Sequence, residues 1–180
     1  MNELSLHIYD IVQNSIRAEA KNVLITITED DELNELKITI KDDGLGMNDE
    51  VLKKVKDPFY TTRTTRNVGL GISLFELAAN QSNGFLSIDT EIGKGTTLTA
   101  VFQKDHIDRS PMGNLTESIY LLCLNEVNIM YKHIINGKSF SYDKAEVLEV
   151  LGSVPLTNTE VKTWLEDYIN KNVKTISDFT

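Results

Sequence analysis

The sequence predicts an α/β two-layer sandwich, because helical and strand-like patterns follow one another along the chain. Residues 4–20 carry apolar side chains at helical spacing, with polar side chains on the opposite side. Residues 22–29 and 36–40 instead alternate apolar and polar side chains, as strands with one buried face do. We therefore expect a helix that packs on one face of a β-sheet.

The next part of the chain repeats this alternation. Residues 71–82 suit a second long helix, which Asn83-Gly84 would end. Residues 85–89 and 97–102 have strand patterns on either side of a turn at Gly93-Lys94-Gly95. These segments supply the further strands and the further helix that a two-layer sandwich needs.

Composition and charge narrow the classes of protein. The chain has 180 residues, of which 41% are hydrophobic and 25% charged, as is ordinary for a globular protein. A net charge of −9 argues against nucleic-acid and anionic-membrane partners. No apolar run approaches the length of a membrane span, and the N-terminus lacks the pattern of a signal peptide. With Cys123 as the single cysteine, these features predict a cytoplasmic protein.

The periodicity breaks over residues 105–113, which we interpret as a linker. It would separate a domain of residues 1–104 from a C-terminal extension of residues 114–180. The extension reads as α-β-β-α-α, with Asn136-Gly137 as a strong hairpin signal. A unit this small buries little core alone, so we expect it to pack on the first domain or on another chain. We therefore expect the extension to serve a protein partner or a second subunit.

Polar and glycine-rich segments lie at the ends of the expected elements. Asp10 and Asn14 are one helical turn apart and share a face. Asp42 ends a strand, where its carboxylate can accept a hydrogen bond from a donor on a ligand. Gly69-Leu70-Gly71 precedes a helix, and the N–H groups at a helix start bind phosphate well. In chain order, these polar and glycine-rich segments are Asp10 to Asn14, Asp42-Asp43-Gly44-Leu45-Gly46-Met47, Asp57-Pro58-Phe59, Asn67-Val68-Gly69-Leu70-Gly71 and Gly93-Lys94-Gly95-Thr96.

Taken in this order, the segments resemble the Bergerat ATP-binding fold of the GHKL superfamily. That superfamily includes type II topoisomerases, mismatch-repair ATPases, histidine kinases and anti-sigma-factor kinases. The resemblance covers residues 4–103 and implies a mixed sheet covered on one face by helices, with ATP and Mg²⁺ as cofactors. The whole chain also resembles small stand-alone ATP-binding proteins of anaerobic bacteria, in which a comparable tail follows the same segments.

The resemblance implies a role for each site residue. Asn14 would hold Mg²⁺ through its side-chain oxygen. Asp10 would orient the attacking water, where other members of the superfamily carry a longer Glu. Asp42 would accept a hydrogen bond from the adenine amino group. The other implied nucleotide-contacting residues are Gly44, Gly46, Met47, Phe59, Arg63, Arg66, Gly69, Leu70, Gly71 and Thr96.

Plainer interpretations stay open for several positions. Phe59 could be a core aromatic, Arg63 and Arg66 could belong to a solvated basic loop, and Thr96 could be an ordinary strand residue. His7 invites a role as a phosphoacceptor, but the chain has no segment that matches a dimerising hairpin with a reactive histidine. We therefore interpret His7 as a residue of the surface or of the pocket edge.

These features predict Mg²⁺-dependent ATP binding, with slow hydrolysis or conditional phosphotransfer, in a cytoplasmic regulatory role. Lid arginines and the metal would neutralise phosphate charge while a carboxylate orients the nucleophile. Two alternatives stay open. The chain could be a non-catalytic module that responds to ATP, or a protein kinase that acts on a partner, as anti-sigma-factor kinases do.

Overall fold

The computed structural model describes residues 3–55 and 70–178. Its strands are β1 (Asn22–Asp30), β2 (Glu35–Asp42), β3 (Phe85–Glu91), β4 (Gly95–Gln103), β5 (Asn128–Ile135) and β6 (Lys138–Asp143). Its helices are α1 (Leu4–Arg17), α2 (Asp49–Val55), α3 (Leu70–Gln81), α4 (Leu115–Cys123), α5 (Lys144–Leu151) and α6 (Thr159–Asp178). The described strands form a six-stranded sheet in the order β3-β4-β2-β1-β5-β6.

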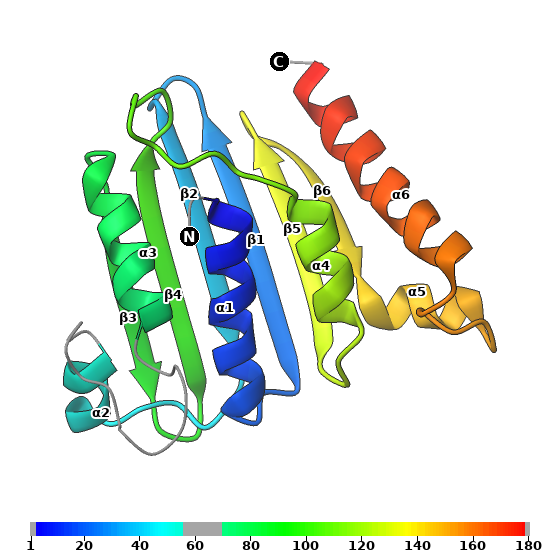
Figure 1. The fold of residues 1–180 in the computed structure, drawn as a ribbon, viewed down its shortest axis with the longest axis horizontal. Helices are drawn as coiled ribbons and strands as arrows, with labels where there is room; N and C mark the ends of the chain where they lie inside the picture. The colour runs from blue at the N-terminus through cyan, green and yellow to red at the C-terminus, as the bar shows by residue number, and fades with distance from the viewer. Residues whose placement is uncertain (1–2, 56–69, 179–180) are drawn as a thin grey trace.

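The predicted two-layer sandwich with a mixed sheet is confirmed. Neighbouring strands run antiparallel, except that β1 and β5 run parallel. Figure 1 shows α1, α3 and α4 side by side on one face of this sheet. The helix α6 packs on α4 and on the last two strands, β5 and β6. The helices α1, α3, α4 and α6 therefore form one layer and the sheet forms the other.

The core lies between α1 and the central strands. In β1 the side chains of Val23, Ile25 and Ile27 face the helices and are fully buried, as the alternating pattern predicts. Their antiparallel neighbours include Ile38 and Ile40 of β2, which are also buried. Each such isoleucine stabilises the fold by about 1.5–3 kcal/mol when it leaves water.

The first helix ends earlier than its apolar pattern predicts. The pattern extends over residues 4–20, whereas α1 stops at Arg17. Glu19 then adopts a left-handed conformation with a φ of 60°. The carbonyl of Ala18 accepts a hydrogen bond from the N–H of Leu45, at 2.8 Å. The chain thus leaves the helix early to reach the loop that follows β2.

The C-terminal extension continues the same sheet. The strand β5 pairs with β1 over eight positions, from Asn22–Asn128 to Glu29–Ile135. The strand β6 returns antiparallel to β5, so the predicted hairpin at Asn136-Gly137 is confirmed. The helix α4 begins at its predicted cap, because Asn114 Oδ1 accepts a hydrogen bond from the N–H of Glu117.

One side of α6 is buried and the other is open to solvent. Val161, Leu165 and Ile169 are buried, whereas Trp164 and Tyr168 are exposed. This helix is therefore amphipathic and belongs to the surface of the sandwich. In the part of the chain that the structure describes, no helix combines the length and apolar character that spanning a membrane requires.

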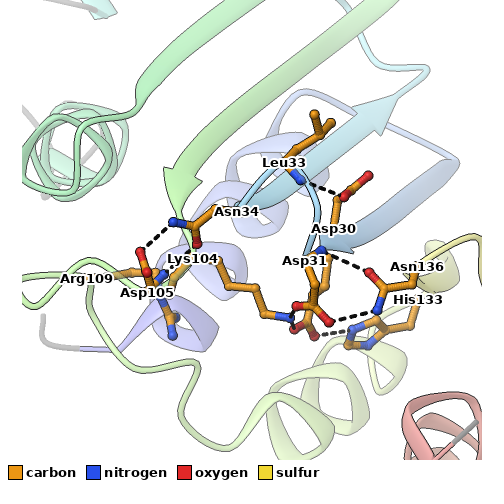
Figure 2. Close-up of polar contacts among 10 residues, drawn as sticks. Asp30, Asp31, Leu33, Asn34, Lys104, Asp105, Arg109, His133 and Asn136 are labelled. Atoms are coloured by element: carbon orange, nitrogen blue, oxygen red, sulfur yellow. Dashed lines mark hydrogen bonds and ion pairs between the residues drawn. The ribbon is translucent and has the colours of Figure 1, made fainter. Parts of the chain in front are cut away.

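A polar network joins the linker and the extension to one end of the sheet (Figure 2). Glu29 on β1 contacts His133 Nε2 through one carboxylate oxygen and Lys104 Nζ through the other, both at 2.9 Å. Lys104 also contacts Asp31 at 2.6 Å, and Asn136 donates a hydrogen bond to Asp31. The hydrogen bond from His133 lowers the pKa of Glu29 to about 2, and Lys104 acts in the same direction against the effect of burial.

The prediction that His7 lies on the surface or the pocket edge is wrong. Its side chain is 1% exposed, because α3 packs on this side of α1. The imidazole stacks on Phe75 with the ring centroids 5.1 Å apart and the planes 12° from parallel. Among residues 3–55 and 70–178, neither ring nitrogen has a hydrogen-bond partner, and burial lowers the pKa of His7 from 6.5 to about 4.

This buried histidine makes the fold sensitive to mild acid. A depressed folded-state pKa means that the unfolded chain binds the proton first, so stability falls as the pH drops from about 6.5 toward 4. We expect the free energy of unfolding to fall by about 2 kcal/mol between about pH 7 and about pH 5. His7→Leu should remove most of this fall, while His106→Gln on the linker should keep it. Urea unfolding at several pH values measures the free energy of unfolding of both variants. If this free energy falls with pH in His7→Leu as steeply as in the wild type, His7 is not the group responsible.

Candidate nucleotide-binding site

A cavity of about 270 Å³ opens between α1, α2, α3 and the nearby strand ends. Most of its lining is apolar, and a few polar side chains converge on it, as in small-molecule sites generally. The lining residues are Ile11, Asn14, Ser15, Arg17, Ala18, Ile40, Asp42, Gly46, Met47, Val51, Val55, Ile72, Ile88, Thr96 and Leu98. The cavity thus brings together Asn14, Asp42, Gly46, Met47 and Thr96 of the predicted site residues.

The carboxylate of Asp42 is held on both oxygens. Its Oδ1 accepts hydrogen bonds from the N–H groups of Gly44, at 3.0 Å, and Thr96, at 3.1 Å. Its Oδ2 accepts a hydrogen bond from the hydroxyl of Ser15, at 2.6 Å. Each carboxylate oxygen has two lone pairs, so the donors among the described residues fill Oδ1 and leave Oδ2 able to accept one more donor.

The sequence prediction missed Ser15. This residue follows Asn14 directly and is 4% exposed, on the same buried side of α1 as Ile11. A hydroxyl on an otherwise apolar helical stripe needs a partner when it is buried. Its place one turn after Ile11 was therefore a signal that α1 faces a buried acceptor, although the identity of that acceptor depends on the fold.

The cavity lining also carries an amide and a guanidinium group. Arg17 donates a hydrogen bond from Nη1 to Asn14 Oδ1, at 2.9 Å, and both residues line the cavity. The prediction missed Arg17 as well. Asp10 does not line the described cavity but lies against the start of α3, where a Cβ on Gly71 would be 3.6 Å from Asp10 Cβ. One side of α1 thus carries the carboxylate of Asp10, the amide of Asn14 and the guanidinium of Arg17.

Two predicted glycines have a structural reason within the protein itself. A Cβ on Gly44 would lie 2.6 Å from the carbonyl oxygen of Ala18, and one on Gly46 would lie 2.0 Å from that of Glu91. Gly46 also has a φ of 67°, which side chains rarely tolerate. These positions therefore let the loop after β2 pack closely on the end of α1 and on the β3–β4 turn.

Two threonine hydroxyls connect this loop to the β3–β4 hairpin. Thr90 Oγ1 accepts a hydrogen bond from the N–H of Met47, at 2.9 Å, and lies 3.1 Å from the carbonyl oxygen of Gly95. It also lies 3.0 Å from Thr96 Oγ1. The prediction missed Thr90, which contacts the cavity only through its neighbours.

Part of the predicted site cannot be compared with the structure. Leu70 and Gly71 begin α3, but the side chain of Leu70 is outside the described part of the chain. The segment Asp57-Pro58-Phe59 and the lid from Tyr60 to Val68 also lie outside the described residues. The predicted site residues that lie outside the described residues are Phe59, Arg63, Arg66 and Gly69.

A family model decides the relationship to known proteins. The model described as "Histidine kinase-, DNA gyrase B-, and HSP90-like ATPase" matches residues 2–106. The chain belongs to this family. The matched segment runs from α1 to the end of β4 and contains the whole cavity, so the chain has an ATP-binding domain of the GHKL type. The extension lies outside the match.

Similar proteins agree with this assignment. Sporulation kinase C of Bacillus subtilis is 33% identical over 100 residues, which cover 56% of this chain and 23% of that protein. Sporulation kinase E of the same organism is 34% identical over 97 residues, which cover 53% of this chain and 13% of that protein. The chain thus spans less than a quarter of the length of these relatives.

A solved structure supports the fold alone. It is described as the N-terminal domain of a DNA repair protein and superposes with a TM-score of 0.54. The superposition covers 78% of this chain and 52% of that chain, at 18% sequence identity. The predicted Bergerat architecture is therefore confirmed by structure as well as by sequence.

Proposed function

We propose that this chain binds Mg²⁺–ATP in the cavity and either hydrolyses it slowly or transfers its phosphate conditionally. The observation that carries the proposal is the fixed Asp42 carboxylate, whose Oδ2 keeps one acceptor position at the end of an apolar slot. We also propose a regulatory role, because the similar proteins are named as sporulation kinases, and a cytoplasmic location, which a single buried cysteine fits.

The apolar part of the cavity suits the adenine base. Ile40, Ile88 and Leu98 line it together with Met47, so a planar ring can be buried between aliphatic side chains. The exocyclic amino group of the base would then donate to Asp42 Oδ2. A hydrogen bond to an ionised acceptor away from water is the main source of base recognition in this arrangement.

The other end of the cavity suits the phosphates and the metal. Mg²⁺ prefers oxygen ligands and keeps waters and phosphate oxygens, so the single amide oxygen of Asn14 fits it. Among residues 3–55 and 70–178, no group of three or more acidic, histidine or cysteine side chains could hold a metal by itself. When bound, Mg²⁺ would neutralise phosphate charge. Arg17 would exchange its hydrogen bond with Asn14 for one to a phosphate oxygen.

One observation favours the non-catalytic alternative. Asp10 has a shorter side chain than the Glu of the resembled topoisomerases, and it lies against Gly71 rather than in the cavity lining. A water held by Asp10 would have to sit between α1 and the start of α3. Phosphotransfer to a protein is the third possibility, because the similar proteins are named as kinases.

Exchange of Asp42 for asparagine tests the adenine contact. The new side-chain amide can keep its oxygen toward Gly44 and Thr96, which leaves its NH₂ group toward Ser15 and the cavity. A donor would then face the donor of the adenine amino group. We expect Asp42→Asn to weaken ATP binding by about 1.5–3 kcal/mol, or about 10- to 150-fold. Asp89→Asn is the matched control, because Asp89 on β3 is exposed and does not line the cavity, so its variant should bind ATP as the wild type does. Equal affinities of wild type and Asp42→Asn in calorimetry would refute the contact.

Two exchanges on α1 separate metal binding from turnover. Asn14→Ala should bind ATP equally with and without Mg²⁺, because it lacks the side-chain oxygen that holds the metal. Asp10→Asn should keep ATP affinity and lower phosphate release by about 100-fold or more. Calorimetry and a phosphate-release assay measure the two effects. A wild-type protein that binds ATP but releases no phosphate would remove the catalytic role of Asp10 and support the binding module.

The extension is the part that we propose to contact a protein partner or a second subunit. It lies outside the part of the chain that the family model matches. It carries Trp164 and Tyr168, whose stacked rings have centroids 5.4 Å apart and whose side chains are 44% and 39% exposed. Removal of the extension would expose the edge of β1, so a surface exchange tests the proposal better than truncation.

Trp164→Ala should abolish capture of a specific partner from native cells or lower the molecular mass in solution. Trp164 is the single tryptophan of the chain, so its emission should shift to shorter wavelength when the surface is covered. Leu77→Ala on α3, where the leucine is 52% exposed, is the control. If mass and captured proteins are the same for all three proteins, and the emission of the wild type does not change with protein concentration or added partner, the extension has no such role.

A further inference from the structure

Thr90 is not among the residues that line the nucleotide cavity, but it contacts two residues that are. It stands near the end of β3, directly opposite Thr96 of β4 in the hairpin register. Its hydroxyl oxygen is within hydrogen-bond distance of the N–H of Met47, the carbonyl oxygen of Gly95 and the hydroxyl of Thr96. Met47 and Thr96 line the cavity, so Thr90 is connected to two of its walls.

The hydrogen atoms of this cluster can be assigned by counting. A threonine hydroxyl has one hydrogen to donate and two lone pairs to accept. The N–H of Met47 can only donate, and the carbonyl oxygen of Gly95 can only accept. All three contacts are satisfied together only if Thr90 donates to Gly95 and accepts from both Met47 and Thr96.

This assignment fixes the direction of the Thr96 hydroxyl. Its hydrogen points at Thr90, so Thr96 Oγ1 can offer only lone pairs to the cavity. Asp42 Oδ2 is also an acceptor, because its partner Ser15 is the donor in their hydrogen bond. The cavity lining therefore contains two acceptors on residues that are joined by the hydrogen bond from Thr96 N–H to Asp42 Oδ1.

We propose that Thr90 is a positioning residue that makes the cavity select a 6-amino purine over a 6-oxo purine. The inference rests on the proposed function and adds the source of base selectivity. A 6-amino group carries two N–H donors, which match acceptors. A 6-oxo group is itself an acceptor, and its burial against other acceptors leaves it unpaired.

Comparison of ATP with inosine triphosphate measures this selectivity directly, because the two nucleotides share ribose and phosphates. The chain of 180 residues is titrated with each nucleotide in the presence of Mg²⁺. The wild type should prefer ATP by at least about tenfold. In Thr90→Val the Thr96 hydroxyl is released and can donate into the cavity, so the preference should fall about tenfold. Thr90→Ser keeps the hydroxyl and should keep the preference.

The ratio of the affinities for ATP and inosine triphosphate distinguishes a change in the direction of the Thr96 hydroxyl from a general loss of packing at Thr90. A purely structural loss at Thr90 would weaken both nucleotides equally and leave the ratio unchanged, which would overturn the proposal. Thr96→Val gives a second measurement, because it removes the acceptor itself and should also lower the preference for ATP. Thr99→Val, on the open face of β4 beside Thr39, is the control and should keep the wild-type ratio. A wild type that binds neither nucleotide would overturn the proposed function, and the role of Thr90 with it.

Discussion

The carboxylate of Asp42 is the group on which the arrangement of the site depends. A carboxylate that is 7% exposed costs several kcal/mol unless its charge is satisfied by donors. Its donors come from three separate parts of the chain: Ser15 on α1, Gly44 in the loop after β2, and Thr96 on β4. Satisfying one charge therefore fixes the distance between the first helix and two strands, and that distance defines the slot between them.

The loop after β2 is shaped by the same constraint. For Gly44 to donate to Asp42, the chain must turn at once and pass close to Ala18 and Glu91, where a Cβ would collide. The hydrogen bonds from Leu45 to Ala18 and from Gly93 to Leu45 hold the loop there. Glycine in this segment is thus required by contacts within the protein before any nucleotide binds.

The helices and strands of the described chain could be predicted well from the sequence, because one buried face gives a clear period of 2 or 3.6 residues. Asp42 and Asn14 could be singled out because they lie in segments of recognisable spacing, and both line the cavity, while their roles toward the base and the metal stay predictions. Thr90 could not, because its contact with Thr96 depends on the β3–β4 register, which a sequence pattern leaves open. His7 was placed wrongly for a related reason: the helical pattern of α1 gives one apolar stripe, and α3 covers a second side.

The strand β1 links the site to the extension and limits how they can communicate. At one end, the N–H groups of Lys21 and Asn22 donate to Asp43, next to Asp42. At the other end, Glu29 is held by His133 and Lys104. Between them lie eight paired positions with β5. The extension cannot rotate as a rigid body without breaking this ladder and uncovering core side chains of β1. Any effect of bound nucleotide on the exposed side of α6 must therefore pass through small shifts of side chains or loops on a continuous sheet, and its size is limited to the difference in affinity of the nucleotide for the two arrangements.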